Sequence, residues 1–74
     1  MIFKLSYLGR EIVFFPERQC QIVAGKLHPL TTEEWFRNLS DVKRILGEQG
    51  KSFKLEQIET NDAEEAALLK PYLS

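Results

Sequence analysis

A thiol and an imidazole are the side chains in this sequence best suited to metal or nucleophilic chemistry. The chain has one cysteine, Cys20, and one histidine, His28, eight positions further on. A zinc site needs about four ligands with paired spacing, and an enzyme needs a recognisable constellation of such groups. Two single residues supply neither. Cys20 is therefore expected to be a small buried hydrophobe, and His28 a surface loop residue beside Pro29.

No other pattern suggests catalysis or a cofactor. The four glycines are scattered at predicted turns and caps, so they do not form a phosphate-binding loop. The acidic residues near the C-terminus lack the alternating spacing of a calcium loop. The sequence thus predicts a protein that is not an enzyme, with no cofactor, no metal and no small-molecule substrate.

A cluster of basic residues raises nucleic-acid binding as the alternative function. Phe53 lies within the cluster and could stack on a base, while the cations would contact phosphates. Against this hypothesis, Glu48 interrupts the cluster, the net charge is -1, and Phe53 is in phase with Leu55, as a core residue would be. The candidate nucleic-acid contacts are Lys43, Arg44, Lys51 and Lys54.

Charge is unevenly distributed along the chain. Residues 1–54 hold nine Lys/Arg and six Asp/Glu, whereas residues 55–74 hold one lysine and five acidic residues. The simpler interpretation is two solvated faces. The other interpretation is head-to-tail self-association, in which the acidic segment of one copy meets the basic region 43–54 of the next.

The first fifteen residues predict a β-hairpin that is apolar on both faces. A tight turn at Gly9-Arg10 would place Leu8 opposite Glu11 and set the register. One face then carries Phe3, Leu5, Tyr7, Ile12, Phe14 and Pro16. The other face carries the residues predicted to line a protein contact: Ile2, Val13, Phe15 and Leu8.

This second face needs a cover, because one packed helix can shield only one side of a sheet. A short C-terminal helix of the same chain is one candidate, and a partner protein or a second copy is the other. A strand edge is also available for pairing with another chain. The sequence therefore favours a non-catalytic module for protein–protein interaction, acting by self-assembly or by docking on a larger partner.

The strongest local pattern is a helix that begins after Thr31. Thr31 and Glu34 form a capping box, and Leu30 and Trp35 have the spacing of a hydrophobic staple. Apolar residues follow at helical spacing, and Gly47 or Gly50 ends the helix. Its predicted apolar stripe is Trp35, Leu39, Val42, Ile45 and Leu46, with Phe36 beside it.

Weaker patterns predict the remaining elements. Residues 16–18 have turn chemistry, or could open a helical turn, and residues 19–27 favour a strand over a helix. Residues 52–58 predict another strand, with a bulge near Gln57 because Ile58 breaks the alternation. A short helix from about Ala63 to Lys70 would end at Pro71. The predicted class is α+β: a small antiparallel sheet of the hairpin plus one or two further strands, packed on one long helix, with a short C-terminal helix.

Length and composition agree with one small domain. The chain has 74 residues, of which 43% are hydrophobic and 28% charged, as in soluble globular domains. One cysteine excludes an internal disulfide and fits a reducing compartment. No stretch approaches a membrane span and no signal-peptide core is evident, so the expected setting is the cytoplasm, without a membrane partner.

From Trp35 to Leu55 the chain resembles small accessory proteins encoded in the head and tail gene module of Mu-like phages. In that pattern, a tryptophan-bearing helix leads through a glycine, here Gly50, into a short hydrophobic strand that starts near Phe53. The spacing between tryptophan and Val42 differs, and the C-terminal helix is additional. The resemblance implies a non-enzymatic assembly or accessory factor and transfers no site residues.

Overall fold

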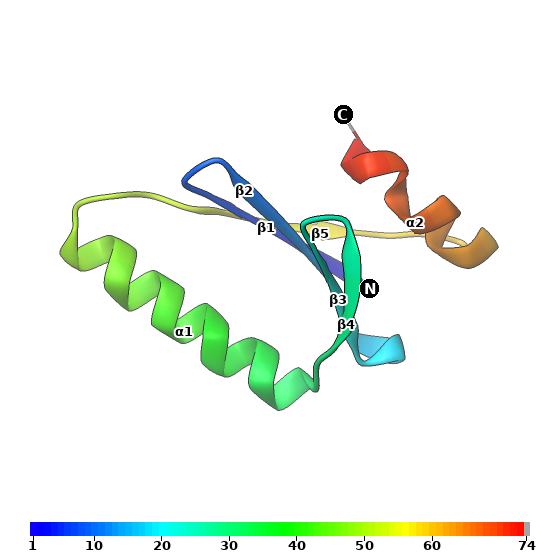
Figure 1. The fold of residues 1–74 in the computed structure, drawn as a ribbon, viewed down its shortest axis with the longest axis horizontal. Helices are drawn as coiled ribbons and strands as arrows, with labels where there is room; N and C mark the ends of the chain where they lie inside the picture. The colour runs from blue at the N-terminus through cyan, green and yellow to red at the C-terminus, as the bar shows by residue number, and fades with distance from the viewer. Residues whose placement is uncertain (74) are drawn as a thin grey trace.

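The computed structural model describes residues 1–73 as a five-stranded antiparallel sheet with two helices, so the predicted α+β class is confirmed (Figure 1). The strands have the spatial order β4-β3-β2-β1-β5, in which the first four form a meander and the fifth returns beside the first. A 3-10 turn, Pro16–Arg18, joins β2 to β3. The other elements are β1 Ile2–Tyr7, β2 Arg10–Phe15, β3 Cys20–Val23, β4 Lys26–Pro29, α1 Thr32–Glu48, β5 Lys54–Ile58 and α2 Ala63–Leu73.

The β1–β2 hairpin turns at Leu8 and Gly9, one residue earlier than predicted. Both residues have positive φ, 48° and 75°, as the type I′ turn of a two-residue hairpin requires. Tyr7 lies opposite Arg10. The predicted pairing of Leu8 with Glu11 is therefore wrong, and Leu8 belongs to neither face. The registers differ by an even number of residues, so the strand residues keep their predicted faces.

The segment after the 3-10 turn forms two strands rather than one. β3 confirms the predicted strand and pairs with β2. The prediction of a loop around His28 is wrong, because Ala24 and Gly25 also have positive φ and reverse the chain into a second hairpin. All four residues of β4 are exposed. This edge strand therefore lacks the alternation of apolar and polar residues that predicts a strand from sequence.

β5 pairs with β1 in regular register. Ile58 lies opposite Ile2, and Gln57 lies opposite Phe3. The predicted bulge near Gln57 is therefore wrong. Ile58 and Leu55 are three positions apart, so they point to opposite faces of an uninterrupted strand. Ile58 packs against the core that contains Ile2.

One face of the sheet carries an aromatic core. Phe14 is fully buried and stacks on Trp35, with ring centroids 4.9 Å apart and planes 15° apart. Phe3 stacks on the same indole at 6.3 Å. Trp35 and Leu39 of α1 share one buried cluster with Phe14 and Leu5 of the sheet. The predicted core position of Trp35 is confirmed.

The ends of α1 follow from its cap residues. The hydroxyl of Thr31 accepts from the backbone N–H of Glu34 at 3.1 Å, and the Glu34 carboxylate accepts from the Thr31 N–H at 2.9 Å. At the other end, Gly50 has a φ of 69° and donates its N–H to the Gly47 carbonyl, while the next N–H reaches the carbonyl of Leu46 at 2.8 Å. This is a Schellman motif, so Gly50 ends the helix and Gly47 lies inside it.

The other face of the sheet is covered by α2. Ile2, Val13, Phe15 and Ile22 form a buried cluster that Leu69 of α2 closes. The predicted second apolar face is confirmed, and the chain itself supplies the first of its two predicted covers. Three partly buried residues pack around this cluster: Cys20, Ile58 and Tyr72.

The backbone of α2 is strained. From Ala63 to Leu69, φ lies between 48° and 55°, and a left-handed helix costs L-residues roughly 1–2 kcal/mol per residue. The regular run of dihedrals ends at Leu69, and the backbone kinks at Lys70 and Pro71, where φ is -6° and -45°. The helix is therefore interrupted at Pro71, as predicted, although the element as a whole extends to Leu73.

Candidate protein-interaction site

Three of the four residues predicted to line a protein contact belong to the interior of this chain. Ile2, Val13 and Phe15 are each at most 2% exposed and lie under α2. They are therefore not free to meet a partner while α2 is docked. The prediction failed here because sequence patterns show that a face is apolar, but not which of two possible covers lies on it.

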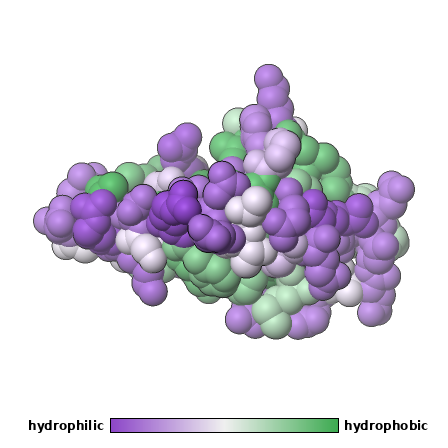
Figure 2. Space-filling view, turned by 90° about the horizontal axis from the view of Figure 1, so that it is seen from below, coloured by the Kyte–Doolittle hydropathy of each residue, from purple (hydrophilic) through white to green (hydrophobic). Residues whose placement is uncertain are grey.

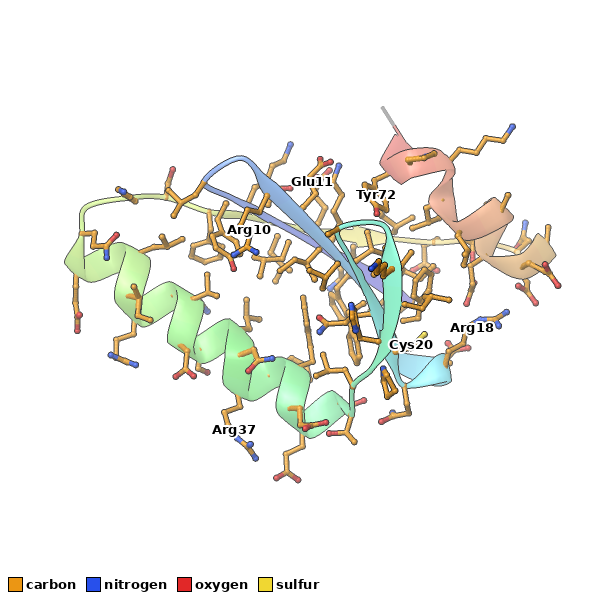
Figure 3. The ribbon with its side chains drawn as sticks, in the orientation of Figure 1. Arg10, Glu11, Arg18, Cys20, Arg37 and Tyr72 are labelled. Carbon is orange, nitrogen blue, oxygen red and sulfur yellow. The ribbon has the colours of Figure 1, made fainter. Side chains whose placement is uncertain are left out.

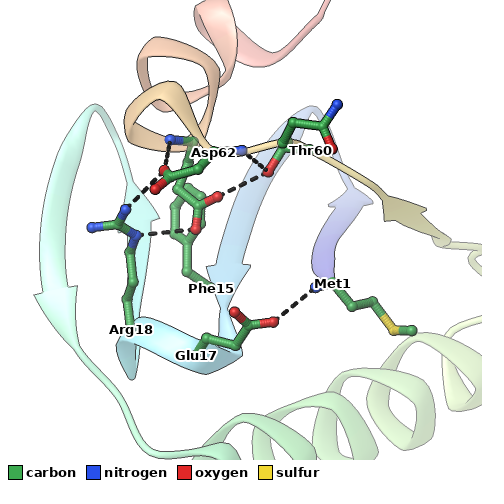
Figure 4. Close-up of a pocket in the computed structure, with 8 residues that line it drawn as sticks. Met1, Phe15, Glu17, Arg18, Thr60 and Asp62 are labelled. Atoms are coloured by element: carbon green, nitrogen blue, oxygen red, sulfur yellow. Dashed lines mark hydrogen bonds and ion pairs between the residues drawn. The ribbon is translucent and has the colours of Figure 1, made fainter.

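An ion-pair clasp ties the start of α2 to the 3-10 turn (Figure 4). Arg18 donates from Nε to Glu65 at 3.0 Å and from Nη2 to Asp62 at 3.1 Å. Thr60 donates its hydroxyl to Glu65 at 2.9 Å, and Asp62 accepts from the backbone N–H of Glu65 at 2.8 Å. These four residues line a pocket of about 390 Å³. Their charged groups satisfy one another, so the clasp is best explained as structural.

Lys4 provides a second tie between the sheet and α2. Its ammonium group lies 3.1 Å from a Glu11 carboxylate oxygen on the neighbouring strand and donates to the Tyr72 carbonyl at 3.3 Å. Asp62 and Glu65 of the acidic C-terminal segment thus pair with Arg18 of the same chain. Head-to-tail association would have to compete with Arg18 for Asp62 and Glu65.

The clasp makes the docking of α2 sensitive to acid. Hydrogen bonds from the Glu65 backbone N–H and the charge of Arg18 lower the pKa of Asp62. A carboxyl whose pKa is lower in the folded state stabilises the fold above its unfolded pKa, about 3.9, and this contribution is lost as pH falls through the folded value. We expect thermal stability to fall between about pH 5 and 2, and Asp62→Asn to flatten that part of the profile. An unchanged profile in this variant would contradict the assignment.

Leu8, the fourth predicted interface residue, is exposed at the tip of the hairpin. Its side chain is 56% exposed although its backbone has a φ of 48°, a conformation in which asparagine or glycine is strongly preferred. Beside it, residues of β1 and α1 line an open pocket of about 190 Å³. We call this surface the tip groove; it is lined by Tyr7, Leu8, Val42, Ile45, Leu46 and Gln49.

Ile45 is the tip-groove residue that the sequence predicted to be in the core. Its helical spacing predicted burial, but the side chain is 43% exposed, whereas Leu46 is buried as predicted. The signal that could have located the groove is the dipeptide Leu8-Gly9, because two residues of positive φ there bring an apolar side chain to the hairpin tip.

The outer side of α1 is polar and solvated. Arg37 projects from α1 away from the sheet and pairs with Glu33 at 3.2 Å (Figure 3). Figure 2, seen from the α1 side, shows hydrophilic side chains across the middle with hydrophobic surface on both sides of them. Apolar surface suited to a protein contact therefore flanks the outer side of the helix.

Cys20 and His28 do not form a reactive pair. The register sets Cys20 opposite Pro29 and His28 opposite Gln21, so the thiol and the imidazole project from opposite faces of the sheet. Cys20 packs against the α2-side core but is only partly buried, less than the buried position predicted for it. Within residues 1–73 no three His, Cys, Asp or Glu side chains lie close enough together to hold a metal ion.

The four predicted nucleic-acid contacts are spread over α1, the following loop and β5, and two of them, Arg44 and Lys54, have carboxylate neighbours. Arg44 is within 4 Å of two carboxylates of its own helix, and Lys54 lies 3.9 Å from Glu56. Lys54 pairs in register with Ser6, which places it on the sheet face opposite to α1. A continuous phosphate-facing surface would need all four residues on one side of the molecule. The residues are Lys43 and Arg44 on α1, Lys51 in the following loop and Lys54 on β5.

No protein-family model, curated protein or solved structure matches this chain. Among the described residues, no helix combines the length and the apolar character needed to cross a bilayer.

Proposed function

We propose that this protein is a non-enzymatic interaction module that docks on a partner protein through the tip groove. The observation that carries the proposal is Leu8. A leucine at this turn position raises the energy of the fold and leaves an apolar side chain in water. Ala24 has the same backbone conformation, so what distinguishes Leu8 is its large apolar side chain, exposed beside an open groove. A contact with another protein would bury that side chain.

The groove has the form of a small anchor site. In this proposal α1 covers its face of the sheet along most of its length, and its C-terminal half forms one wall of the groove. Leu8 and Ile45 stand exposed on either side of a hollow large enough for one apolar side chain. Interfaces concentrate their binding energy in such pockets, where a single aliphatic or aromatic anchor is desolvated.

The ionisable side chains support a role in binding rather than catalysis. Arg18, Asp62 and Glu65 are engaged with one another, and Lys4 is engaged with Glu11 and α2. The lone thiol and imidazole face different sides of the sheet. A single free cysteine, Cys20, is compatible with the cytoplasm as the place of action.

The partial resemblance to accessory proteins of Mu-like phages suggests where a partner would be found. In this extension of the proposal, the module serves in head or tail assembly. Genes for virion proteins beside this gene would support assembly as its role. A neighbouring toxin, nuclease or regulator gene would favour an inhibitor of that neighbour instead.

The proposal predicts that Leu8→Asn separates folding from binding. Asparagine followed by glycine is the preferred type I′ dipeptide, so the variant should be more stable by up to about 1 kcal/mol. It also removes the apolar side chain, so partner binding should fall at least tenfold. Photo-crosslinking and affinity capture from source-cell extract, with urea unfolding in parallel, measure both effects.

Ala24→Asn is the matched control. Ala24 has a φ of 53° and precedes Gly25 in the β3–β4 turn, so it gains the same turn chemistry outside the groove. This variant should be stabilised and should retain the partner that the wild-type chain captures. Equal capture by all three chains, or no protein captured by the wild type, would contradict the proposed function.

A further inference from the structure

The two edge strands of the sheet differ in how well they are protected from pairing. β4 has four residues and ends at Pro29, which has no N–H to donate. Proline and short length are usual protections of an edge. β5 has five residues without proline, pairs regularly with β1, and has no second strand partner among the described residues. β5 is therefore the edge that is open to another strand.

We propose that a second copy of this chain pairs with β5, antiparallel and about a two-fold axis through Leu55. The inference rests on the proposed role in protein interaction and adds to it one partner and a different surface. Strand β5 reads Lys54-Leu55-Glu56-Gln57-Ile58. In an antiparallel pair, residues directly opposite share a face of the sheet, so only a few registers are allowed.

Charge selects one of these registers. When Leu55 lies opposite its own copy, Lys54 of each chain lies opposite Glu56 of the other, and two opposite-charge pairs form. When Glu56 lies opposite its own copy, two carboxylates face each other instead. Opposite charges across a strand pair stabilise it and like charges destabilise it, so the strand favours the register centred on Leu55.

The side chains needed for this pairing are accessible in the single chain. Leu55 is 40% exposed, and self-pairing would cover it with the same residue of the second copy. The Lys54 ammonium is largely exposed, and its nearest carboxylate, Glu56 of the same strand, lies at the 3.9 Å limit of an ion pair. Glu56 also lies 3.9 Å from the Lys4 ammonium, so it has two contacts, both at the distance limit of an ion pair. Pairing with Lys54 of a second copy would add a third cation beside it.

The assembly would be a continuous ten-stranded sheet. Because the two-fold axis is perpendicular to the sheet, the α1 helices of both copies lie on the same face. The tip groove is lined by residues of β1, the hairpin turn and α1 and its C-cap, and no β5 residue lines it. Pairing at β5 can therefore occur with the groove free.

The test uses two single charge reversals of the full chain and their mixture. Sedimentation equilibrium should show a dimer for the wild type, and Lys54→Glu or Glu56→Lys alone should raise the dimer dissociation constant at least about tenfold. An equimolar mixture of the two variants should form a heterodimer. Each lysine introduced in one chain then faces a glutamate introduced in the other, and the remaining pair is complementary too. Added salt should weaken the wild-type dimer.

A wild-type chain that stays monomeric to millimolar concentration would overturn the inference. Single variants that dimerise like the wild type, or a mixture that stays monomeric, would also overturn it. Thermal unfolding of each variant confirms that the chain is folded. Leu8→Asn should dimerise normally, so a failed dimer with intact Leu8-dependent capture leaves the proposed function standing.

Discussion

Phe15→Ala is expected to lower the free energy of unfolding by about 3–5 kcal/mol, the usual cost of truncating a buried phenylalanine. Phe15 is 1% exposed and packs with Ile2, Val13 and Leu69 beneath α2. A domain of this length has a total stability of only about 4–11 kcal/mol. The loss would therefore be a large fraction of the total stability, and urea titration followed by circular dichroism should show a much lower unfolding midpoint.

Leu27→Ala is the control for this prediction. Leu27 lies on the same face of the sheet, opposite Ile22, but its side chain is mostly exposed. Its truncation should change stability by no more than about 0.5 kcal/mol. If Phe15→Ala lowered the free energy of unfolding as little as Leu27→Ala, Phe15 would not lie in the interior. The prediction that Phe15 lines a protein interface would then be supported.

Trp35→Ala should be the second severe variant, with a loss of about 3–5 kcal/mol. The indole stacks on Phe14 and Phe3, which are cross-strand partners, and joins α1 to the sheet. Its removal opens a cavity in the aromatic core and releases the N-terminal half of α1. Near-ultraviolet circular dichroism and urea unfolding would record both losses.

The next residue provides the comparison. Phe36 lies on the same helix but is about half exposed, so Phe36→Ala should cost less than about 1 kcal/mol. Comparable losses for the two variants would mean that α1 packs on the sheet with a different side from the one described.

Local chemistry was sufficient to predict much of the fold. Thr31 and Glu34 specify the start of α1, and Gly50 its end, because each satisfies backbone groups that a helix leaves unpaired. The alternation in the hairpin predicted both faces of the sheet, since face assignment depends only on parity. Trp35 followed from the same helical spacing and from the staple with Leu30.

The remaining features depend on contacts that local sequence does not encode. β4 has no buried residue, so only its turn at Ala24 and Gly25 marks it. The sequence predicted a bulge before Ile58 because local alternation cannot show its partner, Ile2, which lies fifty-six positions earlier in the chain. The identity of the cover over Phe15 depends on whether α2 docks, and the contacts that dock it, Leu69 in the apolar cluster and the ion pairs at Arg18, join segments far apart in the sequence.

The candidate site changed for the same reason. Leu8 was predicted as one of four contact residues, and it is the one that lies on the surface. Its neighbour in space, Ile45, was predicted to be core because periodicity identifies an apolar stripe without showing how far the sheet extends beneath it. The nucleic-acid hypothesis grouped residues that are close in sequence but lie on different elements, with carboxylates beside Arg44 and Lys54.

The central claim is that this chain covers both faces of its own sheet, which leaves the tip groove and the β5 edge for partners. The most direct measurement is the nuclear Overhauser effect between Leu69 methyl groups and the Phe15 ring in the full chain. We expect strong cross-peaks within the monomer and protection of Phe15 from a soluble paramagnetic agent. No cross-peak, together with a Phe15 ring bleached by that agent, would contradict the account.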